Sequence, residues 1–228
     1  MKKIINYIAA FFGQEVRARS VPMRPLREGL RLLSLSVKPR TVIDVGVASG
    51  TPPLYEFFPP DSSAYLLVDA DPYYAASVCA LAESLPAKAE YAACGKERGH
   101  ATLHTFSDHR KSSFGMPLRS LVSAGDVTVP VQTLDSMVEK HALTGPYLLK
   151  IDVEGAEMDV LYGSEKVLSN ACAVVMEVSI APRFKNDTDF SNIVCHMRNY
   201  GFKVSDIVGG ALDKRGCLRQ ADIIFIRS

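Results

Sequence analysis

The sequence predicts one α/β domain with a doubly wound, mostly parallel sheet, an antiparallel last strand and a small inserted β pair. Short apolar runs alternate with amphipathic stretches along most of the 228 residues, as expected for repeated β–α–β units. Most of these runs are continuous rather than alternating, which is typical of strands covered by helices on both faces. The hydrophobic fraction of 47% and the charged fraction of 22% are ordinary for a soluble globular protein.

The expected strands and helices follow one another along the chain. Strands of the main sheet are predicted at Thr41–Val45, Ala64–Val68, Ala87–Ala93, Tyr147–Asp152, Ala173–Val178, Phe202–Ile207 and Asp222–Ile226. Helices are predicted at Leu26–Leu35, Pro72–Leu85, Glu157–Leu168 and Thr188–Tyr200. A loop from Gly209-Gly210 to Gln220 joins the last two strands without a helix, so the last strand is expected to run antiparallel.

Two further β runs, Thr102–Phe106 and Val127–Val131, interrupt this alternation and predict the inserted β pair. The stretch from Ser107 to Gly125 between them is rich in Ser, Gly, His and Arg. A long polar connection of this kind is a candidate substrate loop or lid.

Residues 1–38 are expected to form an N-terminal helical extension to the main domain, which covers residues 39–228. The apolar residues of its first part share one face at helical spacing: Ile4, Ile5, Ile8, Phe11 and Phe12. This face is expected to dock on the core or on a second subunit of a homo-oligomer, and the alternative is a helix lying on a membrane surface. No apolar run approaches the roughly 20 residues that a transmembrane span needs.

Charge and cysteine content exclude several classes of protein. Lys and Arg number 26 and Asp and Glu number 25, so the net charge of +1 gives no argument for a nucleic-acid partner. Five cysteines occur at wide spacing without a CxxC motif, so neither a disulfide framework nor a zinc site is indicated. Reduced cysteines of this kind are typical of a cytoplasmic protein.

The first chemical motif is the run Ile43–Gly50, in which a buried strand enters a turn of small residues that include Ala48 and Ser49. Gly46 and Gly50 permit positive φ and a close approach of the backbone to a ligand, at the sheet edge where α/β proteins bind nucleotides. Asp44 would repel a diphosphate. It would instead bind the cationic amino-acid end of S-adenosylmethionine, directly or through a water molecule. The alternative is an ordinary tight turn between strand and helix.

The second motif surrounds Asp69, which ends the second predicted strand. An acid at this position accepts hydrogen bonds from both ribose hydroxyls of a nucleoside-containing cofactor. Asp71 precedes Pro72 and is predicted to cap the following helix. Ala93, at the end of the third strand, is expected near the adenine, with simple packing as the alternative.

The third motif is a group of ionisable residues at the end of the strand Tyr147–Asp152. Lys150 and Asp152 share one side of that strand, because residues alternate across it, and Glu154 follows at its end. Charges in a buried strand are costly unless they are paired or functional, so this group indicates an active site. The alternative is a Lys150–Asp152 ion pair that only supports the fold. Glu157 is predicted to be an acid in the first turn of a helix.

At these residues the chain resembles FkbM-type methyltransferases. The run KIDVEGAE over Lys150–Glu157 and the run VLYG over Val160–Gly163 are similar to the signature of that family, as are Val129–Asp135 and the turn Ile43–Gly50. The resemblance covers roughly residues 40–228. It implies a class I methyltransferase, Rossmann-like fold, in which an antiparallel last strand is characteristic, and S-adenosylmethionine as the cofactor.

The chain departs from the family pattern at two places. The family usually has Glu-Pro after the second strand, where this sequence has Asp69-Ala70, and the helix after the cofactor turn opens with Thr51-Pro52-Pro53. Known members methylate hydroxyl oxygens of sugars and polyketides. The resemblance therefore implies O-methylation of a sugar, glycan or polyketide-like small molecule, whose identity the sequence does not give.

This reaction assigns roles to the charged residues. Asp152 and Glu154 are the candidate bases for the hydroxyl proton, with Lys150 holding a carboxylate or a substrate oxygen. Asp152 and Glu177, at the end of the next strand, are the candidate ligands of a divalent metal. A metal is not expected, because two carboxylates do not make a complete metal site.

The inserted loop offers further candidates. Ser112 and Ser113 resemble a small polar stretch of the family and are expected to contact cofactor or substrate. His104 and His109 are alternative bases, although a lone histidine in a polar loop more often lies at the surface. Two rival functions remain: a nicotinamide-dependent oxidoreductase, which predicts a third glycine in the cofactor turn, and a non-catalytic nucleotide-binding module, which predicts loss of the charges between Lys150 and Glu154.

Overall fold

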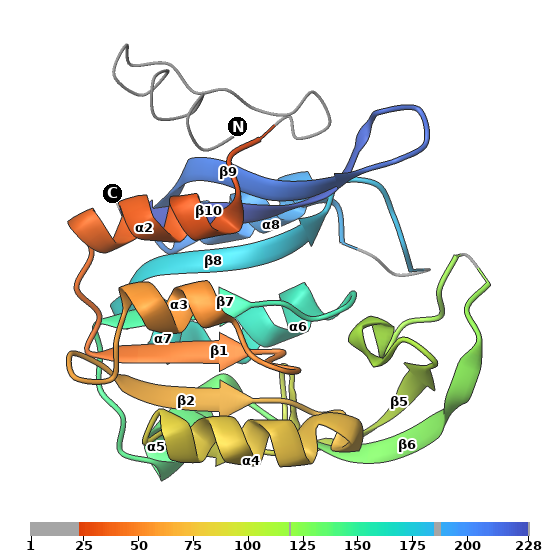
Figure 1. The fold of residues 1–228 in the computed structure, drawn as a ribbon, viewed down its shortest axis with the longest axis horizontal. Helices are drawn as coiled ribbons and strands as arrows, with labels where there is room; N and C mark the ends of the chain where they lie inside the picture. Colours follow the sequence, from red (N-terminus) through yellow and green to blue (C-terminus); the bar gives the residue numbers. More distant parts are fainter. Residues whose placement is uncertain (1–22, 119, 185–187, 228) are drawn as a thin grey trace, which may run out of the picture.

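The structure, a computed structural model, describes residues 23–118, 120–184 and 188–227. The helix expected within residues 4–12 lies outside the described residues. A seven-stranded sheet in the order β3-β2-β1-β7-β8-β10-β9 forms the centre (Figure 1). Its strands are β1 (Thr41–Val45), β2 (Ala64–Val68), β3 (Lys88–Glu90), β7 (Tyr147–Ile151), β8 (Ala171–Ser179), β9 (Phe202–Leu212) and β10 (Leu218–Arg227).

The predicted α/β fold with an antiparallel last strand is confirmed. β1 pairs in parallel with β2 on one side and with β7 on the other, and β7 pairs in parallel with β8. β10 runs antiparallel to both of its neighbours, β8 and β9. Because β2, β1, β7 and β8 point the same way, their carboxyl ends meet at one edge of the sheet. The motif residues lie at this edge.

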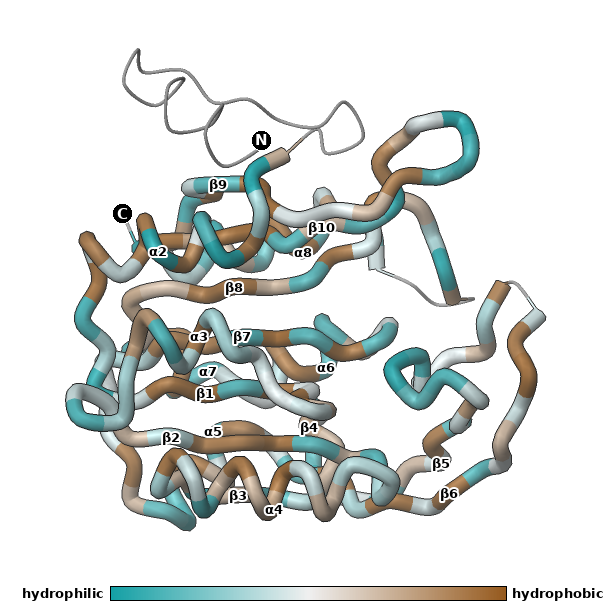
Figure 2. Tube along the Cα trace, viewed as in Figure 1, coloured by the Kyte–Doolittle hydropathy of each residue, from teal (hydrophilic) through white to brown (hydrophobic). Residues whose placement is uncertain are grey.

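Helices cover both faces of the sheet (Figure 1). On one face lie α2 (Leu26–Ser36), α3 (Pro52–Phe57) and α4 (Ala75–Ser84), and we call it the α2–α4 face. The other carries α5 (Leu134–Lys140), α6 (Glu157–Tyr162), α7 (Glu165–Asn170) and α8 (Phe190–Asn199). Every residue of β1 and β7 is buried, which explains why these strands read as continuous apolar runs. Figure 2 shows the hydrophobic strands in the middle and hydrophilic segments at the sheet's carboxyl edge.

The extension before β1 is part of this packing. Leu30 and Leu33 of α2 are buried in the same hydrophobic cluster as residues of the sheet. A Cβ at Gly29 would lie 2.8 Å from a methyl carbon of Val208 in β9, so the small residue allows the helix to approach the sheet. No helix in the described part of the chain is long and apolar enough to cross a membrane.

The inserted strands form a second sheet of three strands, in the order β4-β6-β5. β5 (Gly99–Phe106) and β6 (Ser123–Gln132) form the predicted pair and run antiparallel, and a 3-10 turn, η2 (His109–Lys111), lies in the connection between them. The predicted strand Ala87–Ala93 is wrong as one element. Its first part is β3, whereas β4 (Ala93–Cys94) leaves the main sheet and pairs with β6.

Two other predicted elements need correction. The predicted helix Glu157–Leu168 breaks into α6 and α7 at Gly163, where a Cβ would lie 2.1 Å from the carbonyl oxygen of Gly95. The predicted loop starting at Gly209-Gly210 is instead part of β9, which forms a long hairpin with β10. Both glycines have positive φ at a register shift, and the N–H of Gly209 donates to the carbonyl oxygen of Arg24 in the extension.

Candidate functional site

The turn after β1 has a conformation that requires glycine. Gly46 has a φ of +80°, and a Cβ there would lie 1.9 Å from the carbonyl oxygen of Asp152. The N–H of Gly46 donates to the carbonyl oxygen of Val68, and the N–H of Asp152 donates to that of Val45, both at 2.9 Å. These bonds lock the turn between β2 and β7. The bare backbone at this edge can approach a ligand closely.

A pocket with an empty volume of about 630 Å³ opens beside this turn. The lining includes the following residues that the sequence predicts for the cofactor or for catalysis: Gly46, Ala48, Asp69, Ala93, Ser112, Asp152 and Glu154. The other predicted residues lie outside the lining: Asp44, Ser49, Gly50, Ser113 and Lys150.

Asp69 lies at the edge of the pocket, directly after β2. Its Oδ2 accepts a hydrogen bond from the N–H of Ala48 at 2.6 Å, and its Oδ1 accepts one from the N–H of Asp71 at 2.9 Å. Burial raises the pKa of Asp69, and the two backbone donors oppose that shift. Each carboxylate oxygen can accept a second hydrogen bond, so the fixed side chain keeps acceptor capacity for ribose hydroxyls.

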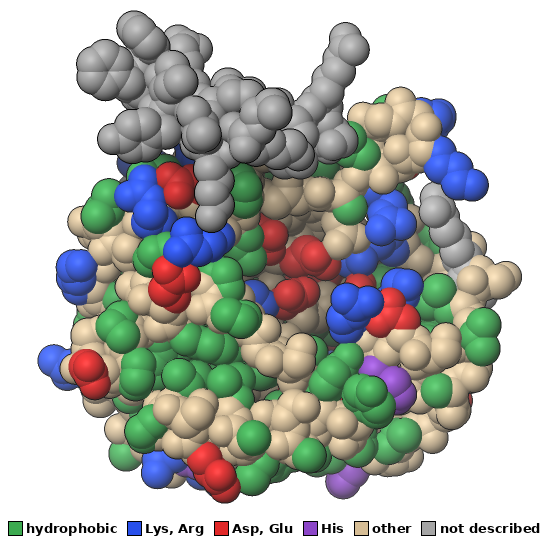
Figure 3. Space-filling model, viewed as in Figure 1, with side chains coloured by type: hydrophobic (Ala, Val, Ile, Leu, Met, Phe, Trp, Pro, Cys, Tyr) green, Lys and Arg blue, Asp and Glu red, His purple; other side chains and the backbone are tan. Residues whose placement is uncertain are grey.

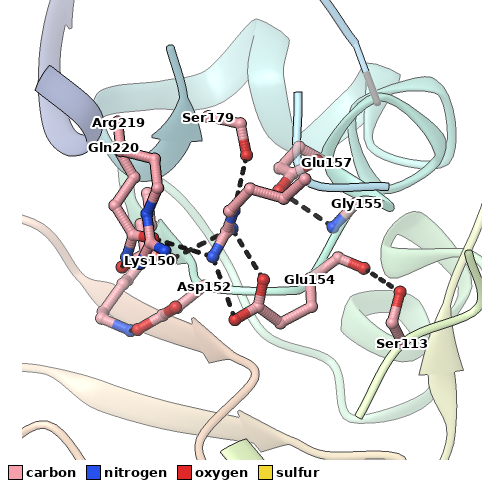
Figure 4. A network of polar contacts seen from close by, with 11 residues as sticks. Ser113, Lys150, Asp152, Glu154, Gly155, Glu157, Ser179, Arg219 and Gln220 are labelled. Atoms are coloured by element: carbon pink, nitrogen blue, oxygen red, sulfur yellow. Dashed lines mark hydrogen bonds and ion pairs between the residues drawn. The ribbon is translucent and has the colours of Figure 1, made fainter. Parts of the chain in front are cut away.

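The inserted segment forms the opposite wall of the pocket. η2 brings His109 to the pocket, and Ser112 follows it. Ser113 is buried, and its hydroxyl donates to the carbonyl oxygen of Glu154 at 2.6 Å (Figure 4), so it joins the insertion to the end of β7. His104 does not line this pocket, and its Nδ1 lies 2.9 Å from Oδ1 of Asp126.

Asp44 and Lys150 lie side by side on β1 and β7 and form a buried ion pair. Lys150 Nζ lies 3.5 Å from Asp44 Oδ1 and 3.0 Å from Asp152 Oδ2. The Tyr55 hydroxyl donates to Asp44 Oδ2 at 2.6 Å. Burial acts against the charge of Lys150, but Asp44 and Asp152 hold its pKa above the ordinary value.

These contacts bear on two predictions from the sequence: the contact of Asp44 with the cofactor, and the ion pair between Lys150 and Asp152. Asp44 is fully buried, its Oδ2 is bonded to Tyr55, and its Oδ1 faces the Lys150 ammonium at 3.5 Å without a hydrogen bond, so the arrangement does not support a direct contact between Asp44 and the cofactor. The Lys150–Asp152 ion pair, named from the sequence as the structural alternative, does form. Asp152 nevertheless lines the pocket, and 43% of its side chain is exposed, so the ion pair leaves its carboxylate accessible.

Three carboxylates, Asp152, Glu177 and Asp222, form what we call the acidic row. Asp222 of β10 and Glu177 of β8 are cross-strand partners, and Asp152 follows β7 beside them. Figure 3 shows acidic side chains gathered in a hollow at the centre of the α2–α4 face. Burial, followed by the charges of Asp152 and Glu177, raises the pKa of Asp222 to about 7. A Cβ at Gly209 would lie 2.6 Å from Asp222 Oδ2, so that glycine leaves room for the carboxylate.

The sequence analysis missed Asp222, because it opens an apolar run with no motif around it. Only the antiparallel pairing of β10 brings it beside Glu177. Among the described residues, no hydrogen-bond donor or cation reaches the Asp222 carboxylate within bonding distance. It is therefore the member of the acidic row that keeps its full capacity to accept hydrogen bonds from a ligand.

Glu154 is held by Arg183, another residue that sequence reasoning missed. Arg183 Nη2 lies 2.6 Å from Glu154 Oε2, and its Nη1 donates to Glu154 Oε1 at 3.2 Å and to Gln220 Oε1 at 2.9 Å. Burial raises the pKa of Glu154 to about 7, although the charge of Arg183 opposes the shift. Figure 4 shows Glu154, Asp152 and Lys150 within one polar network. Arg183 follows β8 in an irregular segment, where no spacing signal exists.

The predicted metal ligands have protein partners of their own. Glu177 Oε1 accepts a hydrogen bond from Gln220 Nε2 at 2.7 Å, and Glu177 Oε2 lies 3.5 Å from Arg183 Nη2. Asp152 is paired with Lys150. Within residues 23–118, 120–184 and 188–227, no group of three or more His, Cys, Asp or Glu side chains is arranged to hold a metal ion.

The fold is similar to several solved structures. TehB from Haemophilus influenzae matches with a TM-score of 0.47 and 8% identity, over 88% of this chain and 62% of that chain. Precorrin-6y C5,15-methyltransferase from Geobacter metallireducens matches with a TM-score of 0.48 and 10% identity, over 89% and 88%. Magnesium protoporphyrin IX methyltransferase from Synechocystis, with bound SAM, matches with a TM-score of 0.45 and 9% identity, over 100% and 97%. No inference about substrate follows from these values.

No curated protein matches the sequence. The model of the methyltransferase FkbM domain matches residues 33–204, which include the Gly46 turn, Asp69 and the charged end of β7. The match spans most of the described chain, and the residues that carry it meet at one edge of the sheet. The chain therefore belongs to the family of methyltransferase FkbM domains.

Proposed function

We propose that this protein is an S-adenosylmethionine-dependent O-methyltransferase that acts on a hydroxyl of a sugar, glycan or polyketide-like small molecule. The observation that carries the proposal is the position of Asp152. Its side chain lines the pocket beside the Gly46 turn, and it also belongs to the acidic row, whose other members come from β8 and β10. One carboxylate thus connects the pocket beside the Gly46 turn with a group of acidic side chains that can hold an acceptor.

The residues around the pocket fit the cofactor. The turn at Gly46 presents backbone without a side chain, and Asp69 presents an oriented carboxylate at the position expected for ribose. Ala93 and Cys94 of β4 line the same pocket and offer an apolar surface for an adenine ring. S-adenosylmethionine, when bound, supplies an electrophilic methyl group. The chain's own task is then to hold the acceptor hydroxyl in line and to take its proton.

Asp152 is the proposed base, and Lys150 is the residue that positions it. The Lys150 ammonium, 3.0 Å from Asp152 Oδ2, holds one oxygen and leaves the other for the acceptor hydroxyl. Glu154 is bound by Arg183 and only 14% of its side chain is exposed, so it serves better to fix the edge of the site. A positioned base of this kind contributes roughly 10²–10⁴-fold to the rate.

The charges of the cleft also favour a class of acceptor. The acidic row and Glu154 contribute four carboxylates, whereas the cations that form ion pairs with them, within the part of the chain that the structure describes, are Lys150 and Arg183. Carboxylates accept hydrogen bonds from hydroxyl and ammonium groups and repel phosphate and carboxylate groups. We therefore expect an acceptor that is neutral or cationic around the methylated hydroxyl.

Calorimetry tests the cofactor assignment. Titration with S-adenosylmethionine, S-adenosylhomocysteine and NAD is expected to show binding of the first two only. Binding of NAD alone would replace the proposed function by a nicotinamide-dependent one. Transfer of a tritiated methyl group to a panel of neutral, amino and carboxylated glycosides then tests the acceptor class, and transfer confined to carboxylated members would contradict it.

A further inference from the structure

The pocket wall opposite the sheet is attached through a carboxylate that the proposed reaction does not use. Asp71 is buried, and its Oδ1 accepts the N–H of Tyr73 at 2.9 Å, as the sequence predicts for a helix cap. Its Oδ2 is bound twice more, by residues of the inserted segment. His109 Nδ1 lies 2.8 Å away and the Ser112 hydroxyl donates at 2.7 Å. A proton on Nδ1 lets the histidine donate to this carboxylate.

Ring stacking reinforces the same contact. The Tyr73 ring, in η1 (Pro72–Tyr74), stacks on the His109 ring with centroids 4.0 Å apart and planes 7° from parallel. Tyr74 meets the same imidazole edge-on at 6.4 Å. The junction of η1 and η2 forms part of the pocket wall, because the lining includes Asp71, Tyr74, His109 and Ser112. His109 is thus fixed by a hydrogen bond and a stacked ring at the position expected to face the nucleoside part of the cofactor.

The insertion is attached to the main domain at two places, near Glu154 and at Asp71, by different kinds of contact. Near Glu154 it forms main-chain bridges, and the N–H of Leu118 donates to the carbonyl oxygen of Arg183 at 2.8 Å. At Asp71 the insertion contacts the main domain through the side chains of His109 and Ser112. Side-chain contacts of this kind can break and reform while the β pairing of the insertion persists. The contacts of His109 and Ser112 with Asp71 are therefore the place where this wall of the pocket can open.

We propose that Asp71, His109 and Ser112 form a latch that retains the cofactor, with His109 covering its nucleoside part. The latch rests on the proposed function, because it needs S-adenosylmethionine in this pocket. While it is closed, cofactor or product stays beneath η2, and its opening precedes release. His109 is the residue that contacts the cofactor, whereas Asp71 and Ser112 position it.

Release of the cofactor measures the latch directly and requires no acceptor. Because the chain has no tryptophan, intrinsic tryptophan fluorescence does not report release. The protein is therefore loaded with tritiated S-adenosylmethionine, and release is followed after an excess of the unlabelled compound is added. His109→Ala removes a hydrogen bond to a carboxylate and the stacked ring, and we expect release about tenfold faster. Ser112→Ala removes one bond and is expected to speed release by a few-fold. His109→Asn keeps a donor but no ring, so an intermediate rate is expected.

The chain offers a matched control within the same insertion. His104 is also paired with a carboxylate, Asp126, at 2.9 Å, but it lies outside the pocket lining. His104→Ala is expected to leave the release rate unchanged. In a double-mutant cycle, Asp71→Asn with His109→Ala is expected to speed release by less than the product of the two single effects, because both changes break the contact between Asp71 and His109.

The outcomes separate the latch from the function on which it rests. If the unchanged protein binds no S-adenosylmethionine, the proposed function fails and the latch fails with it. If the cofactor binds and His109→Ala releases it at the original rate, the latch alone is wrong. Equal acceleration by His104→Ala and His109→Ala would likewise overturn it, since both would then act by loosening the whole insertion.

Discussion

The two halves of the site are built by different means. On the cofactor side, short segments act largely through backbone: the Gly46 turn, the N–H groups that hold Asp69, and the small residues of β4. On the proposed acceptor side, charged side chains in and just after β7 and β8 are held by one another in ion pairs. The first half depends on local conformation, and the second depends on which strands become neighbours. Substitutions in the two halves should therefore fail in different ways.

The largest effect is expected on the acceptor side. Asp152→Asn keeps the shape of the side chain but removes the charge, so transfer should fall by roughly 10²–10⁴-fold while cofactor affinity changes little. Turnover and melting temperature are measured on the same preparation, with an acceptor from the panel. Asp126→Asn removes an equal charge outside the pocket and serves as the control. A variant that melts lower but keeps its turnover would show that the Lys150–Asp152 ion pair only supports the fold.

Gly46→Ala tests the backbone-built half. Its Cβ would lie 1.9 Å from a carbonyl oxygen, at a φ that side chains rarely adopt, so the turn must move. We expect a loss of about 3 kcal/mol or more in the free energy of unfolding, together with loss of cofactor binding. Gly99→Ala is the control, because a Cβ there would meet no atom within 4 Å. Similar unfolding curves for the two variants would contradict the geometry of the turn.

Asp69→Ala tests whether cofactor affinity depends on one side chain as well as on backbone. Loss of hydrogen bonds to a charged group should weaken S-adenosylmethionine binding by about 1.5–3 kcal/mol in calorimetry. Asp61→Ala, at an exposed position after α3, should bind like the unchanged protein. A folded Asp69→Ala variant with unchanged affinity would move the ribose site elsewhere in the pocket.

The smallest expected effect is a pH dependence that arises in the acceptor half. The pKa values of Glu154 and Asp222 are raised to about 7, so the folded protein keeps protons that the unfolded chain loses near its ordinary values of about 4. Stability contributed by these groups should therefore fall as pH rises from about 4 to 7 and level off above. Urea unfolding followed by circular dichroism at pH 5.5 and pH 8 measures the difference in the free energy of unfolding between these two pH values. Asp222→Asn should reduce the difference by about 1–2 kcal/mol, and an unchanged difference would refute the assigned shift.

Local sequence predicted the geometry around the Gly46 turn and Asp69 well. β1 and β2 have the predicted bounds, Asp71 caps η1 as expected, and Gly46, Ala48, Asp69 and Ala93 line one pocket. These features depend on a few adjacent residues, namely an apolar run, a turn that needs glycine, and an acid after a strand. The division of Ala87–Ala93 between two sheets was not predictable in this way, because pairing of β4 with β6 depends on residues some forty positions away.

The sequence by itself determined the α/β class, the antiparallel last strand and the charged group at the end of β7. Only the tertiary structure decided how those charges are used: it buried Asp44 against Lys150 and Tyr55, paired Glu154 with Arg183, and left Asp222 without a partner among the described residues. An ion pair depends on a few ångströms between side chains that lie far apart in sequence. No periodicity or motif encodes that separation, whereas a turn or a buried strand is encoded where it forms.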